Sequence, residues 1–250
     1  MEIGIQISSV RSFLQDNAGV CESFIKAAQM GYKYIQVQWV SPDVRADVVQ
    51  RALIDAGLNC VGTQDYYDEV VPRINNVIAD NIQWGGRYVT VSGIPVRFRS
   101  LEGCVQLAAE LDTVVKRTEA AGLTLAFHPV YSDYAAHDGR ALFDTLLEHA
   151  TASMQVCLDA YHVVKAGYDP SDWIRRLAGR IDLIHFKDYA IDGAGGEALS
   201  PVGQGVIDWE PIVRACHATG VKYCFAEQET SIKDPFECLA ESYNFIRDRL

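Results

Sequence analysis

The chain has 250 residues, 49% of them hydrophobic, and a formal net charge of −11. This length and apolar content suffice for one large core, so we expect a single domain that spans residues 1–250. The negative charge argues against nucleic acid and anionic membranes as partners, because both require clustered Lys and Arg side chains.

Short apolar runs alternate with segments of helical periodicity along the first half of the sequence. The expected elements are strand 3–8, helix 18–30, strand 34–39, helix 42–56, strand 58–63, helix 72–84, strand 88–92 and helix 101–121. A glycine follows each of these helices, at Gly31, Gly57, Gly85 and Gly122. Glycine is the common helix stop because it adopts the left-handed conformation without a clash at Cβ.

The second half continues the same alternation. The expected elements are strand 123–127, helix 141–150, strand 154–158, helix 170–177, strand 181–185, helix 209–219, strand 223–226 and helix 235–249. Eight strands and eight helices favour a closed (β/α)8 TIM barrel over an open α/β sheet. The segment after the first strand, Ile7–Arg11, also lacks the glycine-rich phosphate loop of an open nucleotide-binding sheet.

Four strands of the second half end in an acid or a histidine: His128, Asp159, His185 and Glu227. In a parallel barrel these side chains meet at the carboxyl-terminal rim, which is where barrel enzymes carry out their chemistry. The competing interpretation is a buried structural network of polar groups. We favour the functional interpretation because charged side chains are seldom buried without partners and because several strands end in the same kind of residue.

Several motifs occur in an order and spacing that resemble one family. They are Gly31-Tyr32-Lys33-Tyr34-Ile35-Gln36-Val37, Leu158-Asp159-Ala160-Tyr161-His162, Ile184-His185-Phe186-Lys187-Asp188, Pro201–Trp209 and Ala226-Glu227-Gln228-Glu229. Together they resemble the xylose-isomerase-like barrels of the sugar phosphate isomerase/epimerase group. Relatives in that group include inosose dehydratase, hydroxypyruvate isomerase, ketose 3-epimerases and endonuclease IV. The resemblance covers nearly the whole chain.

The resemblance implies one divalent metal ion, held by Glu, Asp, His and Glu after strands five to eight. Asp159, His185 and Glu227 match the last three ligands, whereas the fifth-strand position is occupied by His128. Mixed carboxylate and imidazole ligands suit Mn, Co, Mg, Zn or Fe. A metal-bound histidine nitrogen cannot also abstract a proton. The replacement of the family's Glu by His128 therefore affects which residue can act as the base. The substitute ligands considered for this position are Asp133, Glu229 and Gln64.

Further site residues are expected near these ligands, from their spacing and their places at strand ends. Glu227, Lys187 and His162 are the expected catalytic residues; structural alternatives are a loop histidine for His162 and a salt bridge from Lys187 to Asp188 or Asp159. The expected substrate-binding residues are Gln64, Gln36, Arg97 and Trp39. Gln36 stands where many relatives have Glu, which removes a charge from the site. Arg97 and Trp39 are equally compatible with an exposed loop and a packing role, respectively.

The resemblance therefore implies a metal-dependent isomerase or epimerase of a small sugar or keto-sugar that works through an enediolate. Two alternatives stay open: a lyase resembling inosose dehydratase, and a degenerate barrel that binds a sugar without turnover. Endonuclease activity is a fourth, less favoured function. No apolar run reaches the roughly 18 residues that span a bilayer, and no basic region precedes an apolar core at the start, so we expect a cytoplasmic protein. The sequence leaves homo-oligomer formation open.

Overall fold

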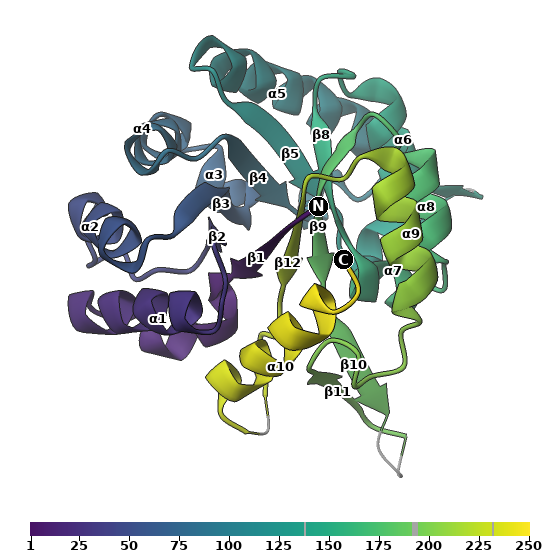
Figure 1. Ribbon diagram of the computed structural model, residues 1–250. Helices are drawn as coiled ribbons and strands as arrows, with labels where there is room; N and C mark the ends of the chain where they lie inside the picture. The colour runs from purple at the N-terminus through teal and green to yellow at the C-terminus, as the bar shows by residue number, and fades with distance from the viewer. Residues whose placement is uncertain (138, 192–194, 232) are drawn as a thin grey trace.

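Eight parallel strands close into a barrel in the order β1, β12, β9, β8, β5, β4, β3, β2. The computed structural model describes residues 1–137, 139–191, 195–231 and 233–250. Figure 1 shows the helices as an outer ring around these strands. The fold is a (β/α)8 TIM barrel, as predicted. No helix in the described ranges combines the length and the apolar character that a membrane crossing demands.

The predicted elements of the barrel are confirmed with small shifts at their ends. The strands are β1 Glu2–Gln6, β2 Tyr34–Val37, β3 Asn59–Tyr66, β4 Tyr88–Ser92, β5 Thr124–His128, β8 Gln155–Asp159, β9 Ile181–Phe186 and β12 Tyr223–Ala226. The helices of the outer ring are α1 Asn17–Gln29, α2 Ala46–Ala56, α4 Ile74–Trp84, α5 Leu101–Ala120, α6 Leu142–His149, α8 Pro170–Arg176, α9 Trp209–Thr219 and α10 Pro235–Arg247. Helix α2 begins four residues later than predicted because Ser41 forms a turn, accepting from the Val44 N–H through its carbonyl and from the Asp43 N–H through its hydroxyl.

Short elements that the sequence did not predict follow the carboxyl ends of several strands. They are the 3-10 helices η1 Ile7–Phe13, η2 Val96–Phe98 and η3 Tyr131–Tyr134, the helices α3 Tyr67–Val70 and α7 Ala160–Lys165, and the antiparallel pairs β6 Ala136–His137 with β7 Arg140–Ala141 and β10 Asp188–Ile191 with β11 Glu197–Ser200. They are too short to carry a periodic pattern. All lie at the rim where the predicted site residues emerge.

Inside the barrel, a small apolar cluster closes the floor below this rim. Its members are Val61, Tyr88, Ala126, Cys157, Leu183 and Phe225. The last four precede His128, Asp159, His185 and Glu227 by exactly two positions. Because side chains alternate between the two faces of a strand, residues two apart point the same way. The four polar side chains therefore point into the barrel, one layer above the floor.

Asp188 anchors the segment that connects β11 to α9. Its fully buried carboxylate accepts hydrogen bonds from the backbone N–H groups of Gly203 at 2.9 Å and Ile207 at 3.3 Å and from the Trp209 indole Nε1 at 2.8 Å. Gly205 also donates to it, and a Cβ at Gly205 would lie 2.1 Å from Asp188 Oδ1. The Gly203-Gln204-Gly205 motif is thus a tight turn around this carboxylate.

Replacing Asp188 with Asn is expected to lower the free energy of unfolding by about 3 kcal/mol, because a charged acceptor that serves several donors is replaced by one neutral oxygen. Urea unfolding followed by tryptophan fluorescence measures the change, and Trp209 is itself one of the donors. The control is Asp208→Asn, which alters the exposed N-cap of α9 and is expected to cost less than about 1 kcal/mol. Equal losses in both variants would contradict the anchoring role.

Candidate metal centre at the barrel mouth

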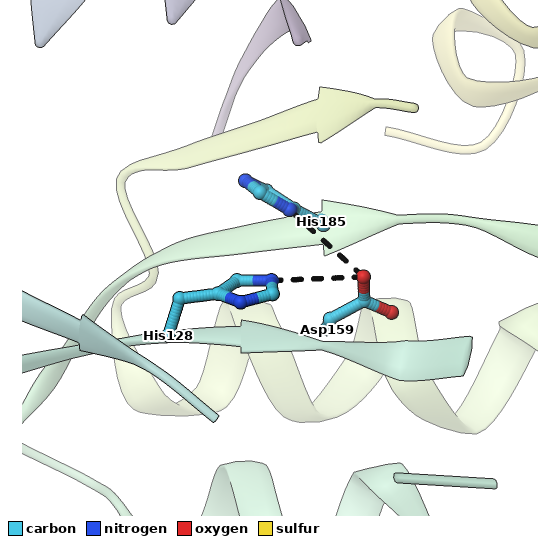
Figure 2. Close-up of side chains that lie close together, drawn as sticks. All are labelled: His128, Asp159 and His185. Atoms are coloured by element: carbon cyan, nitrogen blue, oxygen red, sulfur yellow. Dashed lines mark ion pairs between the residues drawn. The ribbon is translucent and has the colours of Figure 1, made fainter. Parts of the chain in front are cut away.

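Three of the four predicted ligands converge at the ends of β5, β8 and β9, as Figure 2 shows. His128 Nε2 lies 3.7 Å and His185 Nδ1 lies 3.9 Å from the same oxygen, Asp159 Oδ2. All three side chains are buried, and one potential ligand atom from each lies within 4.8 Å of the others. The strand register places Asp159 beside His185, so the β8 and β9 ligands are neighbours across one ladder.

The fourth predicted ligand, Glu227, completes this cluster just beyond the end of β12. Its Oε2 lies 2.8 Å from His185 Nδ1, and the side chain is buried. Metal–ligand bonds of about 2.0 to 2.2 Å place neighbouring ligand atoms about 3 to 3.5 Å apart. The distances across this cluster bracket that range.

Both imidazoles are oriented by neutral partners on the far side of the ring. His128 Nδ1 lies 3.0 Å from Ser92 Oγ, and His185 Nε2 lies 2.7 Å from Gln36 Oε1. Gln36 itself accepts from Gln6 Nε2 and donates to Thr90 Oγ1. When Nδ1 of His128 and Nε2 of His185 carry the proton, the opposite nitrogens present their lone pairs to the cluster. Such outer partners are typical of metal-ligating histidines.

The donor set fits a divalent metal. Four buried potential ligand atoms face one another, and their close contacts are ion pairs among themselves and with Lys187: His128 Nε2, Asp159 Oδ2, His185 Nδ1 and Glu227 Oε2. Burying charged groups is costly unless they are paired, and a divalent ion placed among these atoms would serve as a partner for all four. The two carboxylates attract a divalent cation, although they share their charge with the ammonium of Lys187. His128 thus brings a fourth potential ligand atom to the cluster.

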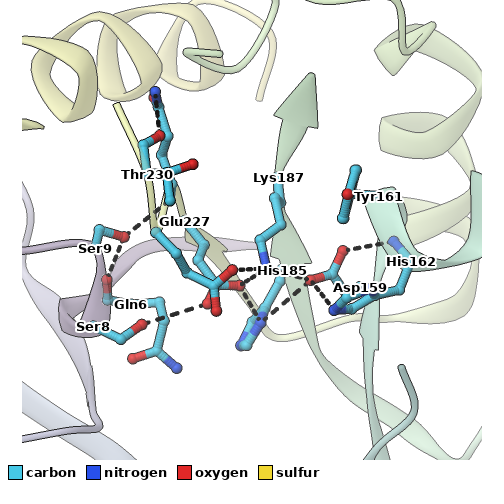
Figure 3. A network of polar contacts seen from close by, with 12 residues as sticks. Gln6, Ser8, Ser9, Asp159, Tyr161, His162, His185, Lys187, Glu227 and Thr230 are labelled. Atoms are coloured by element: carbon cyan, nitrogen blue, oxygen red, sulfur yellow. Dashed lines mark hydrogen bonds and ion pairs between the residues drawn. The ribbon is translucent and has the colours of Figure 1, made fainter. Parts of the chain in front are cut away.

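Lys187 stands among the carboxylates of the site, as Figure 3 shows. Its buried ammonium nitrogen lies 3.4 Å from Asp159 Oδ2, 3.3 Å from Glu227 Oε2 and 3.0 Å from Glu229 Oε2. Burial alone would raise the pKa of Glu227, but Lys187 and His185 lower it to about 2. Burial likewise opposes ionisation of Lys187, yet the carboxylates hold its pKa above the usual value. The predicted salt bridge to Asp159 is present, whereas Asp188 binds the turn described above.

His162 lies next to the cluster, at the start of α7. Its backbone N–H donates to Asp159 Oδ1 at 3.1 Å, and its Nε2 lies 3.8 Å from Asp159 Oδ2. Burial lowers the pKa of the imidazole to about 3, with Lys187 acting in the same direction, so the ring is neutral near pH 7. Its buried Nδ1 has no hydrogen-bond partner among the described residues.

The four predicted substrate-binding residues occupy different surroundings. Gln36 lies below the ligands and holds His185, whereas Gln64 is buried on β3 with its Oε1 unpaired among the described residues. Trp39 has a left-handed backbone, with φ of 56°, and its ring lies 6.2 Å from that of Tyr66. Arg97 points to the surface, where it makes hydrogen bonds of 2.7 and 3.0 Å to Asp68. The structure thus does not bring Arg97 to the ligand cluster.

Sequence reasoning missed Ser92, which is the residue that orients His128. Ser92 ends the fully buried strand β4, so the rule that identified the four ligands, a polar residue at a strand end, also applies to it. Of the substitute ligands considered, Glu229 reaches Lys187 and Asp133 lies outside the cluster. Asp133 Oδ2 instead accepts from the backbone N–H groups of Ile94 and Val130 and so joins the loops after β4 and β5.

Asp133 is expected to make stability depend on pH, because burial raises the pKa of its carboxyl to about 7. An unfolded Asp releases its proton near pH 4, so folding takes up a proton between these values. The free energy of unfolding should therefore fall, by about 2 to 4 kcal/mol, as pH rises from about 4 to 7, and level off above. Urea unfolding of wild type and Asp133→Asn at several pH values isolates this contribution. Parallel curves for the two proteins would contradict it.

Comparison with known proteins assigns the fold to a family. A family model described as xylose isomerase-like TIM barrel matches residues 24–249. The chain belongs to this family. Among solved structures, the barrel resembles a sugar phosphate isomerase/epimerase from Parabacteroides distasonis with a TM-score of 0.81 and 20% identity, covering 98% of this chain and 97% of that one. It also resembles L-ribulose 3-epimerase, with a TM-score of 0.77 and 19% identity over 100% of this chain and 95% of that one.

Sequence relatives match shorter stretches of this barrel. Inosose dehydratase of Geobacillus thermodenitrificans is 28% identical over 123 residues, which are 42% of this chain and 41% of that protein. A probable endonuclease 4 of Mycobacterium bovis is 31% identical over 124 residues, 45% of this chain and 49% of that protein. The chain thus aligns with less than half the length of either relative. The resemblance to this family predicted from the motifs is confirmed.

Proposed function

We propose that the protein is a divalent-metal-dependent isomerase or epimerase of a small sugar or keto-sugar and works through an enediolate. The observation that carries the proposal is the convergence of four buried potential ligand atoms from His128, Asp159, His185 and Glu227. A metal ion bound there would polarise the substrate carbonyl and make the adjacent C–H bond more acidic. Membership of the family supports a sugar as the substrate, and the four potential ligand atoms support metal-assisted proton abstraction.

Each surrounding side chain has a distinct part in this proposal. Glu227 has a second oxygen, Oε1, which accepts from Ser8 Oγ at 3.4 Å and would take up the carbon-bound proton. Lys187, buried and cationic, donates a proton to the developing oxyanion. His162 Nδ1, neutral and unpaired, exchanges a proton on the other side of Asp159. Gln64 Oε1 accepts from a substrate hydroxyl.

The second candidate is a lyase that removes water from a keto-polyol, supported by the similarity to inosose dehydratase. Proton removal next to a carbonyl is common to isomerisation, epimerisation and elimination of water, so the same ligands serve all three. Lys187, which is buried and cationic, would then protonate the departing hydroxyl. The barrel that binds sugar without turnover is less well supported, because His128 contributes a fourth potential ligand atom to the cluster.

The test begins with metal content of protein purified without a histidine tag and supplemented with Mn, Co, Zn or Mg. The metal-loaded protein is then incubated in deuterium oxide with a panel of ketoses, keto-polyols and their phosphates and followed by NMR. Deuterium entering the product at one carbon without loss of water supports the isomerase or epimerase. A new conjugated dione absorbance supports the lyase. Binding of metal with neither reaction would leave the sugar-binding barrel.

A further inference from the structure

The ammonium group of Lys187 shares two carboxylate oxygens with the candidate metal centre. It lies 3.4 Å from Asp159 Oδ2 and 3.3 Å from Glu227 Oε2. The same two oxygens lie 3.9 Å and 2.8 Å from His185 Nδ1, which is a potential ligand atom. Figure 3 shows both carboxylates in contact with His185 and with Lys187. Each oxygen is therefore within reach of a metal ion held by the histidines and of a cation that the chain itself supplies.

A third carboxylate contacts the ammonium from the segment after β12. Glu229 Oε2 lies 3.0 Å from Lys187 Nζ, which is the shortest of the three distances. Lys187 is the one ion-pair partner that Glu229 has in the described part of the chain. Three carboxylates, one at the end of β8 and two in the segment after β12, thus converge on a single ammonium group.

Burial and neighbouring side chains hold the lysine in this position. Lys187 is 1% exposed, and its Nζ lies 5.7 Å from the centre of the Tyr161 ring. The next residue, Asp188, binds the turn that precedes α9 and so fixes the backbone beside the lysine. No other lysine or arginine in the described ranges pairs with any of the three carboxylates. The chain therefore builds one permanent cation into the barrel mouth.

Carboxylate oxygens that are shared in this way suit a pair of cations. Paired metal ions in enzymes typically lie about 3.5 to 4 Å apart. One oxygen can bind both ions at that spacing, because a zinc–oxygen bond, for example, is about 2.0 to 2.2 Å long. Asp159 Oδ2 and Glu227 Oε2 are two such oxygens, and the ammonium of Lys187 takes the place of one ion. A second dication is excluded from this place because like charges repel more strongly in a buried site than in water.

We propose that Lys187 limits the centre to one metal ion, because its ammonium group occupies the position of a second ion. The proposal rests on the metal centre of the proposed function and is independent of the reaction and the substrate. Charge supports it, since three ionised carboxylates and one ammonium leave two negative charges, which one dication neutralises. A shorter, uncharged residue at position 187 would free the second position. Asp159 and Glu227 would then bind both ions, and Glu229 would bind the second alone.

The number of metal ions bound by Lys187→Ala tests this proposal. Wild type and variants are dialysed to equilibrium against the same excess of Mn²⁺, and the bound metal is measured by elemental analysis. The wild type should hold one ion per chain and Lys187→Ala should hold two. Lys187→Gln, which keeps a polar side chain of intermediate length, should also hold two. Electron paramagnetic resonance should show the two Mn²⁺ ions as a coupled pair, because they share ligands.

Two further variants locate the second ion. Glu229→Gln in the Lys187→Ala background removes a ligand of the second position and should return the count to one. Lys165→Ala removes a lysine that pairs with Glu197 outside the cluster, so it should hold one ion. One ion in both Lys187 variants, once circular dichroism shows them folded, overturns the proposal, as does a second ion that is uncoupled or survives Glu229→Gln. A wild type that binds no metal would instead reject the metal centre, and the proposed function with it.

Discussion

Asp159→Asn is expected to weaken binding of the divalent metal by more than about 100-fold, since even the outer partners of metal ligands are typically worth 10- to 100-fold. Asp159 Oδ2 is the atom on which His128 and His185 converge, so this variant removes a charge from the centre of the ligand set. Asn has the same shape, and the fold should persist. Dialysis against a graded chelator series followed by elemental analysis measures the affinity.

The matched control for that variant is Asp65→Asn. Asp65 lies on β3 near the same rim, and its carboxylate accepts the Tyr66 N–H outside the ligand cluster. The metal affinity of the Asp65→Asn variant should equal that of the wild type. Stoichiometric metal with unchanged affinity in Asp159→Asn would reject the ligand assignment, whereas loss of metal in both variants would indicate a general effect of acidic charge at the rim.

The barrel and its polar layer follow from local patterns in the sequence. Alternation of apolar runs and helical periodicity is a property of neighbouring residues, and it located all eight barrel strands. The period of two along a strand then placed His128, Asp159, His185 and Glu227 above the apolar floor, because Ala126, Cys157, Leu183 and Phe225 precede them by two residues. Once the strands form a closed barrel, their carboxyl ends meet at one rim, so the meeting of these four side chains could be predicted from the sequence.

Contacts between loops were not predictable in this way. The motif Ile184–Asp188 places Lys187 near His185, but its position among Asp159, Glu227 and Glu229 depends on three strands meeting. The pattern gave no means to choose between Lys187 contacting Asp188 and Asp159. For the same reason Arg97 was a candidate for substrate binding, although the structure turns it to Asp68 on the preceding loop. Side-chain direction on short irregular segments is set by such long-range pairs.

Gln36 stands where many relatives have a glutamate, and its contacts explain how the site accommodates this difference. The neutral amide accepts from His185 Nε2 and from Gln6 and donates to Thr90. Gln36 thereby orients a candidate ligand from beneath and has few hydrogen-bonding groups left for substrate. The loss of charge that the sequence suggested is therefore compatible with the candidate metal centre, because Gln36 lies outside the four potential ligands and contacts only the far side of His185.

Lys187→Met is expected to abolish proton exchange while retaining the metal. Loss of a positioned proton donor typically lowers the rate by about 100- to 10,000-fold. Metal affinity should stay equal or increase, because the ammonium that is removed lies 3.4 Å and 3.3 Å from ligand oxygens of Asp159 and Glu227 and repels a cation bound there. Deuterium exchange by NMR and chelator competition measure the two effects on one protein sample.

The control for the lysine variant is Lys165→Met, which removes a lysine from the same rim. Lys165 is paired with Glu197 and Tyr161 outside the ligand cluster, so exchange and metal affinity should both match the wild type. Removing one partner of a buried charge cluster typically costs about 3 to 5 kcal/mol, and metal should restore that loss in Lys187→Met because it neutralises the same carboxylates. Exchange within tenfold of wild type in Lys187→Met would exclude the lysine as proton donor and leave Glu227 and His162 to transfer the protons.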